Sequence, residues 1–136
     1  PEQYVTQKIV QSVKNISQGL QDKLKLGRLD ISRDWGWAPE YVEAMWLMLQ
    51  QDKPDDYVIC SGETHSVKEF AELAFSLAGM NYKDYVKIDK NLIRPAEVET
   101  LLADSSKAKK ILKWKPQYKS GDLIDEMIKY EQNLYK

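Results

Sequence analysis

The chain places a strand pattern directly before a helix pattern at residues 57–79, YVICSGETHSVKEFAELAFSLAG. Residues 57–60 are apolar and partly β-branched, which is typical of a short buried strand. Ser66 and Glu69 have the spacing of a capping box, in which each side chain satisfies a free backbone amide at the start of a helix. Gly79 is suited to end that helix. The stretch therefore predicts a strand that leads into a capped helix, and with it a mixed α/β fold.

Further elements are predicted on both sides of this stretch. Apolar residues at helical spacing predict a helix over 4–18 that ends at Gly19. Pro39 suits the first position of a second helix. The apolar stripe of this second helix consists of Val42, Met45 and Leu49. The remaining predictions are strands at 24–26, around Ile31 and at 85–88, an irregular stretch at 89–103, a helix capped by Asp104 that reaches Leu112, and a last helix capped by Ser120.

Bulk properties exclude several classes of protein. The 136 residues suit one domain, and the net charge of −1 provides no field that would gather nucleic acid. No apolar run approaches the roughly 20 residues that a membrane-spanning helix needs. Cys60 is the single cysteine, which fits a reducing compartment. We therefore expect a cytoplasmic protein with neither nucleic acid nor a membrane as its partner.

Motifs for cofactors and metals are weak or missing. The six glycines never approach the spacing of a phosphate-binding loop. Tyr4 and Lys8 match Tyr-x-x-x-Lys, but a chain this rich in lysine yields such a match by chance. His65 is the only histidine, and a metal site needs several converging ligands, so we interpret it as a turn residue with local hydrogen bonds. Lys8 flanks the apolar face of its helix, where its ammonium group could reach a neighbouring cleft or remain in solvent.

The arginines carry the strongest chemical signal. Lysine outnumbers arginine by 17 to 3, and arginine grips phosphate oxygens through two parallel bonds where lysine offers a point charge. Arg33 precedes a helix, and Arg94 is held extended by Pro95. The two could clamp a diphosphate, with Glu97 placed to accept bonds from sugar hydroxyls. Structural salt bridges, between Arg33 and either Asp34 or an acid elsewhere, explain the same residues equally well.

Six segments together resemble the GDP-mannose 4,6-dehydratases of the extended short-chain dehydrogenase superfamily. They are LGRLD (26–30), RDWG (33–36), EYVEAMW (40–46), GETHSV (62–67), RPAEV (94–98) and SKAKK (106–110). An Arg-Asp-Trp sequence before a helix is shared among nucleotide-sugar epimerases and dehydratases, whereas GETHS and RPAE are more specific. Position 28 departs from the family pattern, in which an asparagine is expected in place of Arg28.

The resemblance covers only the carboxy-terminal part of that family, and it implies most of the functional expectations. It implies an NAD(P)-binding Rossmann-like fold of which residues 1–136 form a single substrate-binding domain, with the last strand and helix elements of the Rossmann sheet and an incomplete nucleotide fold. The glycine-rich NADP loop and the catalytic residues of the family lie upstream of the matching part. The chain is then a fragment that is inactive alone.

The resemblance also assigns residues and partners. Arg33 and Arg94 are expected to hold the diphosphate of GDP-mannose, Val5 and Lys8 to approach the nucleotide, and Glu97 to contact its ribose. The complete enzyme is expected to use NADP and to form a homo-oligomer. Two alternatives remain open: part of a related nucleotide-sugar epimerase or reductase, and a non-catalytic module that acts through protein contacts.

Overall fold

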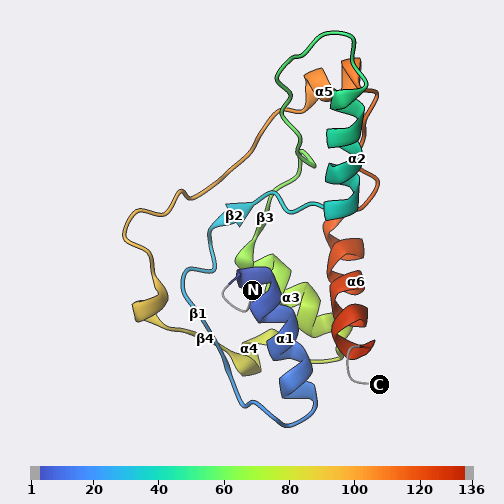
Figure 1. The fold of residues 1–136 in the computed structure, drawn as a ribbon. Helices are drawn as coiled ribbons and strands as arrows, with labels where there is room; N and C mark the ends of the chain where they lie inside the picture. Colours follow the sequence, from blue (N-terminus) through green and yellow to red (C-terminus); the bar gives the residue numbers. More distant parts are fainter. Residues whose placement is uncertain (1–3, 134–136) are drawn as a thin grey trace.

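The computed structural model describes residues 4–133, with side chains up to Glu131, so the predicted domain bounds at 1 and 136 lie outside the described residues. In chain order the elements are α1 (Val5–Ser17), β1 (Leu24–Leu26), β2 (Ser32–Arg33), α2 (Ala38–Leu49), β3 (His65–Ser66), α3 (Val67–Leu77), α4 (Tyr82–Tyr85), β4 (Val86–Ile88), η1 (Lys90–Leu92), α5 (Ser106–Ile111) and α6 (Ser120–Asn133). Figure 1 shows a larger lobe built on α1, α3 and α6, and an arm that carries α2 and α5.

The larger lobe contains the main core. Its centre is formed by Phe70 and Phe75 of α3 together with Ile9 and Val13 of α1, all at most 2% exposed. Helix α6 packs against both α1 and α3 and adds Ile124. The helical spacing in residues 4–18 therefore predicted this packing face correctly. Gly19 ends α1 with a φ of 71°, a left-handed conformation that favours glycine.

The capping box of α3 is confirmed. The amide of Glu69 donates to the Ser66 hydroxyl at 3.1 Å, and the amide of Ser66 donates to the Glu69 carboxylate at 2.6 Å. The backbone amide of Ser66, and then its hydroxyl, hold the pKa of Glu69 below its ordinary value. This local device fixes where α3 begins, directly after the loop at 61–65.

Two small sheets connect distant segments. β1 pairs with β4 in parallel, with Leu24 opposite Val86 and Leu26 opposite Ile88, which confirms the strand predicted at 24–26 and, except for Tyr85, which ends α4, the strand predicted at 85–88. β2 pairs antiparallel with β3, and Ser32 makes an isolated bridge to Thr100. These pairings bring the end of β1, the start of β2 and the irregular segment 89–103 to one side of the larger lobe (Figure 1).

The arm corrects two predictions. Residues 57–60 are not a strand, and only Cys60 is buried there, with its thiol donating to the carbonyl of Ala103 at 3.2 Å. A strand needs a neighbour for its backbone hydrogen bonds, and no described strand pairs with these residues. The predicted stripe on α2 is exposed, because among the described residues α2 packs through Ala44 against α5 and Trp114 instead. The exposed fractions are 61% for Val42, 58% for Met45 and 82% for Leu49.

The last helix also begins differently from the prediction. Ser120 is the first residue of α6, and its hydroxyl lies 2.8 Å from Nε2 of His65 instead of capping the helix. The carboxylate of Asp122, in the first turn of α6, accepts the amide of Lys119 at 3.0 Å, which ties the residue before the helix to the helix. No helix of the described residues is both long and apolar enough to cross a membrane.

Candidate functional site

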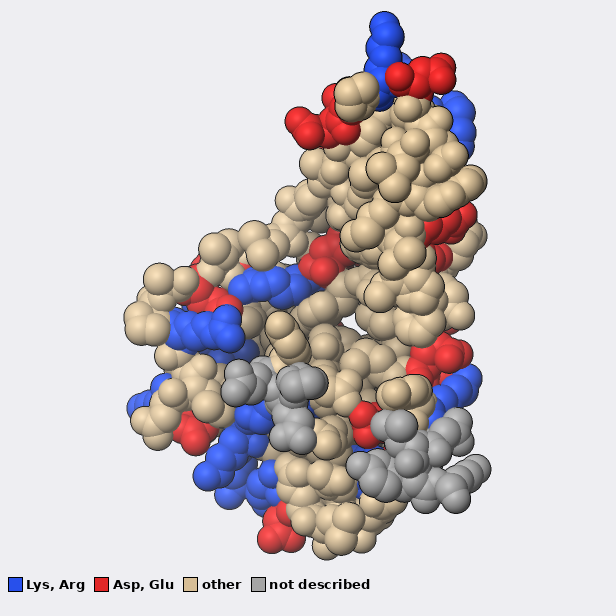
Figure 2. Space-filling model, in the orientation of Figure 1, with Lys and Arg blue, Asp and Glu red and all other residues tan. Residues whose placement is uncertain are grey.

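A cleft of about 610 Å³ opens on the side of the larger lobe where β1, β2 and residues 91–97 meet. All three arginines of the chain line it, as does Lys8 from the second turn of α1. Figure 2 shows basic side chains gathered over this side of the molecule. The five residues assigned from the sequence are all in its lining: Val5, Lys8, Arg33, Arg94 and Glu97. Val5 and Glu97, 92 positions apart in sequence, therefore line one basic cavity.

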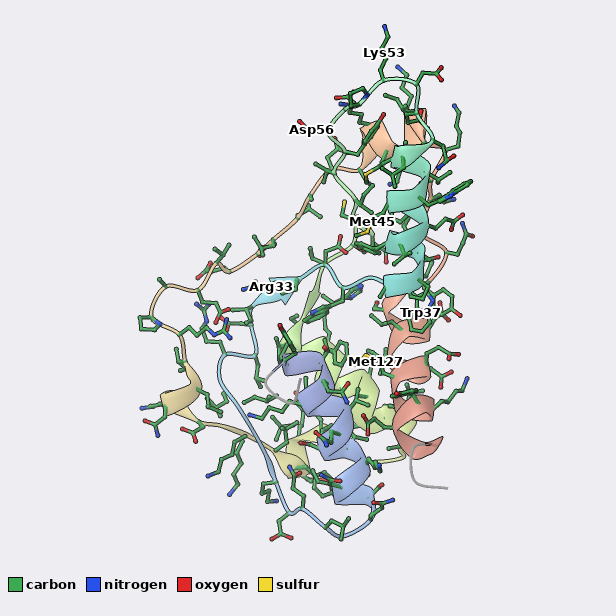
Figure 3. The ribbon with its side chains drawn as sticks, viewed as in Figure 1. Arg33, Trp37, Met45, Lys53, Asp56 and Met127 are labelled. Carbon is green, nitrogen blue, oxygen red and sulfur yellow. The ribbon has the colours of Figure 1, made fainter. Side chains whose placement is uncertain are left out.

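Arg33 is held in place by the protein itself. From β2 (Figure 3), its Nη1 donates at 2.8 Å to the carbonyls of Ser32 and Val98, and its Nη2 donates to Oε1 of Glu97 at 3.0 Å. Both side chains of the pair are mostly buried, with 21% of Arg33 and 15% of Glu97 exposed. The sequence left a salt bridge and a ligand-binding arginine as alternatives. The structure contains the salt bridge, with a distant acid, inside the cleft.

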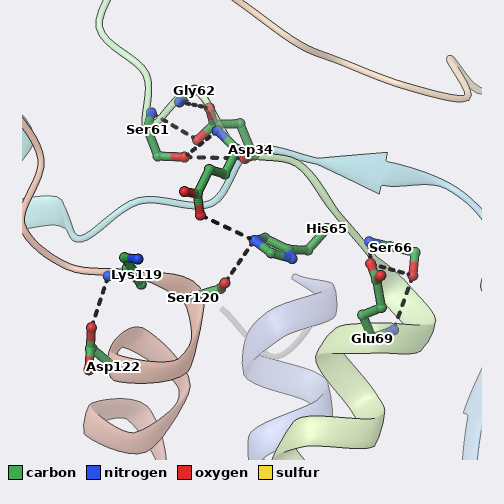
Figure 4. Close-up of polar contacts among 10 residues, drawn as sticks. Asp34, Ser61, Gly62, His65, Ser66, Glu69, Lys119, Ser120 and Asp122 are labelled. Atoms are coloured by element: carbon green, nitrogen blue, oxygen red, sulfur yellow. Dashed lines mark hydrogen bonds and ion pairs between the residues drawn. The ribbon is translucent and has the colours of Figure 1, made fainter.

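Asp34, the other candidate partner of Arg33, has a different role. Its carboxylate accepts the amide of Ser61 at 3.1 Å and that of Gly62 at 2.9 Å (Figure 4). Asp34 thus fastens the loop before β3 to the end of β2. Consecutive residues of the Arg-Asp-Trp motif therefore hold two different segments, residues 97–98 and the loop at 61–62.

Arg94 differs from Arg33 in being free. It is exposed, it lies two residues after the end of η1, and no other described residue accepts a hydrogen bond from it or pairs with it. Its planar group consequently keeps all of its donors for a bound anion. Of the two arginines assigned from the sequence, Arg94 is the more available and Arg33 the better oriented.

The remaining assigned residues form the rim and the floor of the cleft. Lys8 donates from Nζ to the carbonyl of Lys25 at 2.7 Å, so its position is fixed while two of its protons stay available. Val5 packs against the main core and contributes an apolar surface. Glu97 uses Oε1 for Arg33 and has a second carboxylate oxygen, so it can accept a hydroxyl without leaving the ion pair.

Arg28 was left unassigned, although it lines the same cleft. Its Nε and Nη2 form a bidentate pair with Asp30 at 2.9 and 2.7 Å, and Nη2 also reaches Oε1 of Glu99 at 3.3 Å. These hydrogen bonds, first the one to Asp30, raise the pKa of Arg28 and lower that of Asp30. The rarity of arginine, with three arginines against 17 lysines, was the signal that could have identified Arg28 as a residue of the cleft.

The net charge of the cleft favours an anion with several oxygens. Four cationic side chains line it, and Glu97 is the acid in the lining. Arg33 is paired with Glu97, and Arg28 with Asp30 and Glu99, so Lys8 and Arg94 carry the positive charge that remains for the oxygens of a diphosphate. Gly27 brings two backbones together here, because a Cβ at this position would lie 2.7 Å from the carbonyl oxygen of Leu92.

A second cavity, of about 330 Å³, lies between the loop at 61–65 and the start of α6. His65 lines it and shares a hydrogen bond with Ser120, while Oε2 of Glu63 is 3.9 Å from the same ring nitrogen (Figure 4). Both contacts meet Nε2, so they do not form the relay that a catalytic triad needs. The described residues contain no cluster of metal ligands. His65 is the first residue of β3, and its hydrogen bond joins it to Ser120, 55 positions away in sequence, so the interpretation as a turn residue with local hydrogen bonds is wrong.

Comparisons with known proteins agree with this geometry. Residues 1–127 match the family described as GDP-mannose 4,6 dehydratase. The chain is 53% identical to GDP-mannose 4,6 dehydratase 2 of Arabidopsis thaliana over 99% of its own length and 36% of that protein. It is 41% identical to GDP-mannose 4,6 dehydratase of Homo sapiens, over 98% of the chain and 40% of that protein. The chain therefore spans little more than a third of these curated relatives.

Solved structures show the same fold. The structure of RMD from Pseudomonas aeruginosa complexed with NADPH aligns with a TM-score of 0.88 and 20% identity, covering 98% of this chain and 44% of that one. This likeness confirms the predicted fold class, a part of the NAD(P)-binding short-chain dehydrogenase fold. Sequence and fold together show that the chain belongs to the GDP-mannose 4,6-dehydratase family.

Proposed function

We propose that the chain acts within a longer enzyme that converts GDP-mannose to GDP-4-keto-6-deoxymannose, and that its basic cleft holds the GDP part of the substrate. One observation carries this proposal: every arginine of the chain lines a single cleft. Family membership supports the identity of the nucleotide sugar. The enzyme is then a lyase, and residues 1–136 form its substrate-binding domain.

Within the cleft, we assign the diphosphate to Arg94 and Arg33. Arg94 supplies an unpaired guanidinium group. Arg33 supplies a guanidinium group whose orientation is set by hydrogen bonds to Glu97 and to two backbone carbonyls. Each charge-assisted hydrogen bond contributes about 1.5–3 kcal/mol. Val5 and Lys8 lie at the end of the cleft formed by α1 and are assigned to the nucleoside. Glu97 is assigned to the ribose through its second oxygen.

Hydride chemistry is assigned to residues outside this chain. A nicotinamide cofactor needs a phosphate-binding glycine loop, and the six glycines here lack that spacing. The residues present therefore do not fit NADP, although the complete enzyme is expected to use it. We assign no catalytic residue to the chain and expect it to be inactive alone. A homo-oligomer and a cytoplasmic location remain predictions.

Isothermal titration of the complete protein tests the proposal. GDP-mannose should bind, UDP-glucose should bind far more weakly, and Arg94→Gln should raise the Kd for GDP-mannose by roughly tenfold or more. The matched control is Lys129→Gln, which removes an exposed cation paired with Asp125 on α6 and should leave binding unchanged. Preference for a UDP-sugar would instead support the related epimerase. Absence of binding to any nucleotide sugar would support a non-catalytic module and overturn the proposal.

A further inference from the structure

The segment that carries Arg94 has little structure of its own. Between η1 and α5, residues 93–105 form no described helix, and their one backbone pairing is the bridge between Thr100 and Ser32. Two backbone hydrogen bonds accompany it: the amide of Ser32 donates to Glu99 at 2.7 Å, and the amide of Leu101 donates to Ser32 at 3.3 Å. The stretch at 94–98 therefore depends on side chains for its position.

Two arginines supply those side-chain contacts in parallel. Glu97 and Glu99 lie two residues apart, in irregular backbone that follows the turn at 95–96. Glu97 meets Arg33 at 3.0 Å, and Glu99 meets Arg28 at 3.3 Å. Arg28 is in turn anchored by its bidentate pair with Asp30 on the other wall of the cleft. Two ion pairs therefore connect residues 28 and 33 on one wall of the cleft to residues 99 and 97 on the other.

We propose that Arg28 is a positioning residue for Arg94: through Asp30 and Glu99 it fixes the segment 94–99 as a wall of the cleft, so that Arg94 faces the diphosphate. This inference rests on the proposed function. It gives a role to the position where the family pattern has asparagine. Direct ligand binding suits Arg28 less well, because two of its three guanidinium nitrogens already donate to carboxylates.

The test compares Arg28→Gln, Glu99→Ala and the double variant in the complete protein, with titrations of GDP and of guanosine. Each single variant should raise the Kd for GDP by roughly threefold to thirtyfold, the range for residues that act without touching the ligand. The double variant should be no worse than either single variant, because both break the same contact. Guanosine affinity should fall less than GDP affinity, because guanosine keeps the ribose assigned to Glu97 but lacks the diphosphate that Arg94 is proposed to hold. Lys107→Gln, which removes an exposed pair with Asp55 on the arm, is the matched control.

Each other outcome rejects the assignment. A direct contact would appear as weaker GDP binding in Arg28→Gln but unchanged or tighter binding in Glu99→Ala, because the latter change frees the guanidinium. Unchanged GDP affinity in both variants would show that the backbone bonds alone position the segment. An equal loss for GDP and guanosine would indicate general structural damage. If the unaltered protein binds no GDP, the proposed function itself fails, which is a distinct result.

Discussion

Substituting Gly27 by alanine should separate the two walls of the cleft. A Cβ there would lie 2.7 Å from the carbonyl oxygen of Leu92, about 0.7 Å inside the 3.4 Å at which ordinary contact begins. Neither side can move away easily. The amide of Asp89 donates to Leu26 at 2.8 Å, and within η1 the amide of Leu92 donates to Asp89 at 3.0 Å. The clash is therefore with fixed backbone and not with a flexible side chain.

The magnitude follows from two opposing effects. Overpacking of this kind destabilises by about 1–3 kcal/mol, while replacing glycine by alanine stabilises by about 0.4–1 kcal/mol through the unfolded state. The clash dominates, so Gly27→Ala should lower the free energy of unfolding by roughly 1–2 kcal/mol. Because η1 ends only two residues before Arg94, its displacement should also raise the Kd for GDP by roughly threefold or more.

Thermal unfolding and GDP titration of the complete protein measure both effects. Gly121→Ala is the matched control, because its Cβ would meet only Leu73 Cδ2 at 3.9 Å and its place in α6 favours alanine by about 0.5–1 kcal/mol. That variant should unfold at a higher temperature and bind GDP normally. If Gly27→Ala is as stable as the unaltered protein and binds GDP with the same affinity, the close approach of the two backbones is not a constraint on the cleft.

Three further predictions concern Arg33 and the capping box at the start of α3. Arg33→Lys in the complete enzyme should raise the KM for GDP-mannose by roughly tenfold or more, because lysine replaces an oriented fork with a point charge; steady-state kinetics with an unchanged KM would reject the assignment. Ser66→Ala should cost about 1 kcal/mol in chemical unfolding through loss of the cap, and an unaltered midpoint would show that β3 fixes the helix start without it. Folding lowers the pKa of Glu69, so its ionised carboxylate stabilises the fold at pH values above the unfolded pKa of about 4.3. This stabilisation is lost as the pH falls through the pKa of the folded state. Glu69→Gln should thus lose less stability on acidification than the unaltered protein, and an identical pH profile would contradict this.

Local signals predicted the local structure well. The helical spacing of α1 and the capping box of α3 are set by residues within a few positions of one another, so the sequence alone determined both. The arm shows where such reasoning fails. Residues 57–60 and the apolar stripe of α2 have the patterns of buried elements, but among the described residues no surface lies against the stripe and no strand lies beside 57–60. A periodic pattern predicts burial, yet it does not supply the partner that burial requires.

For the cleft, residue type was more informative than spacing. Arg33 and Arg94 were selected because lysine would serve an ordinary exposed position, and both line the cleft. The rarity of arginine singles out Arg28 equally, although this position departs from the family pattern and the resemblance assigns it no role. Long-range partners such as Glu97 for Arg33 could not be predicted, because ion pairs across 64 residues leave no local pattern.

The three arginines divide two tasks that conflict in any single side chain. A guanidinium that is held tightly by carboxylates is well placed but has fewer donors for a ligand, whereas a free one has all its donors but pays conformational entropy on binding. Here Arg28 and Arg33 are each fixed by an acid of the segment 97–99, and Arg94 on the same segment is left free. On the positioning role proposed for Arg28, fixing Glu97 and Glu99 lowers the ordering cost for Arg94 without occupying it. An irregular segment can thus present a free, oriented arginine, provided that other arginines hold the segment.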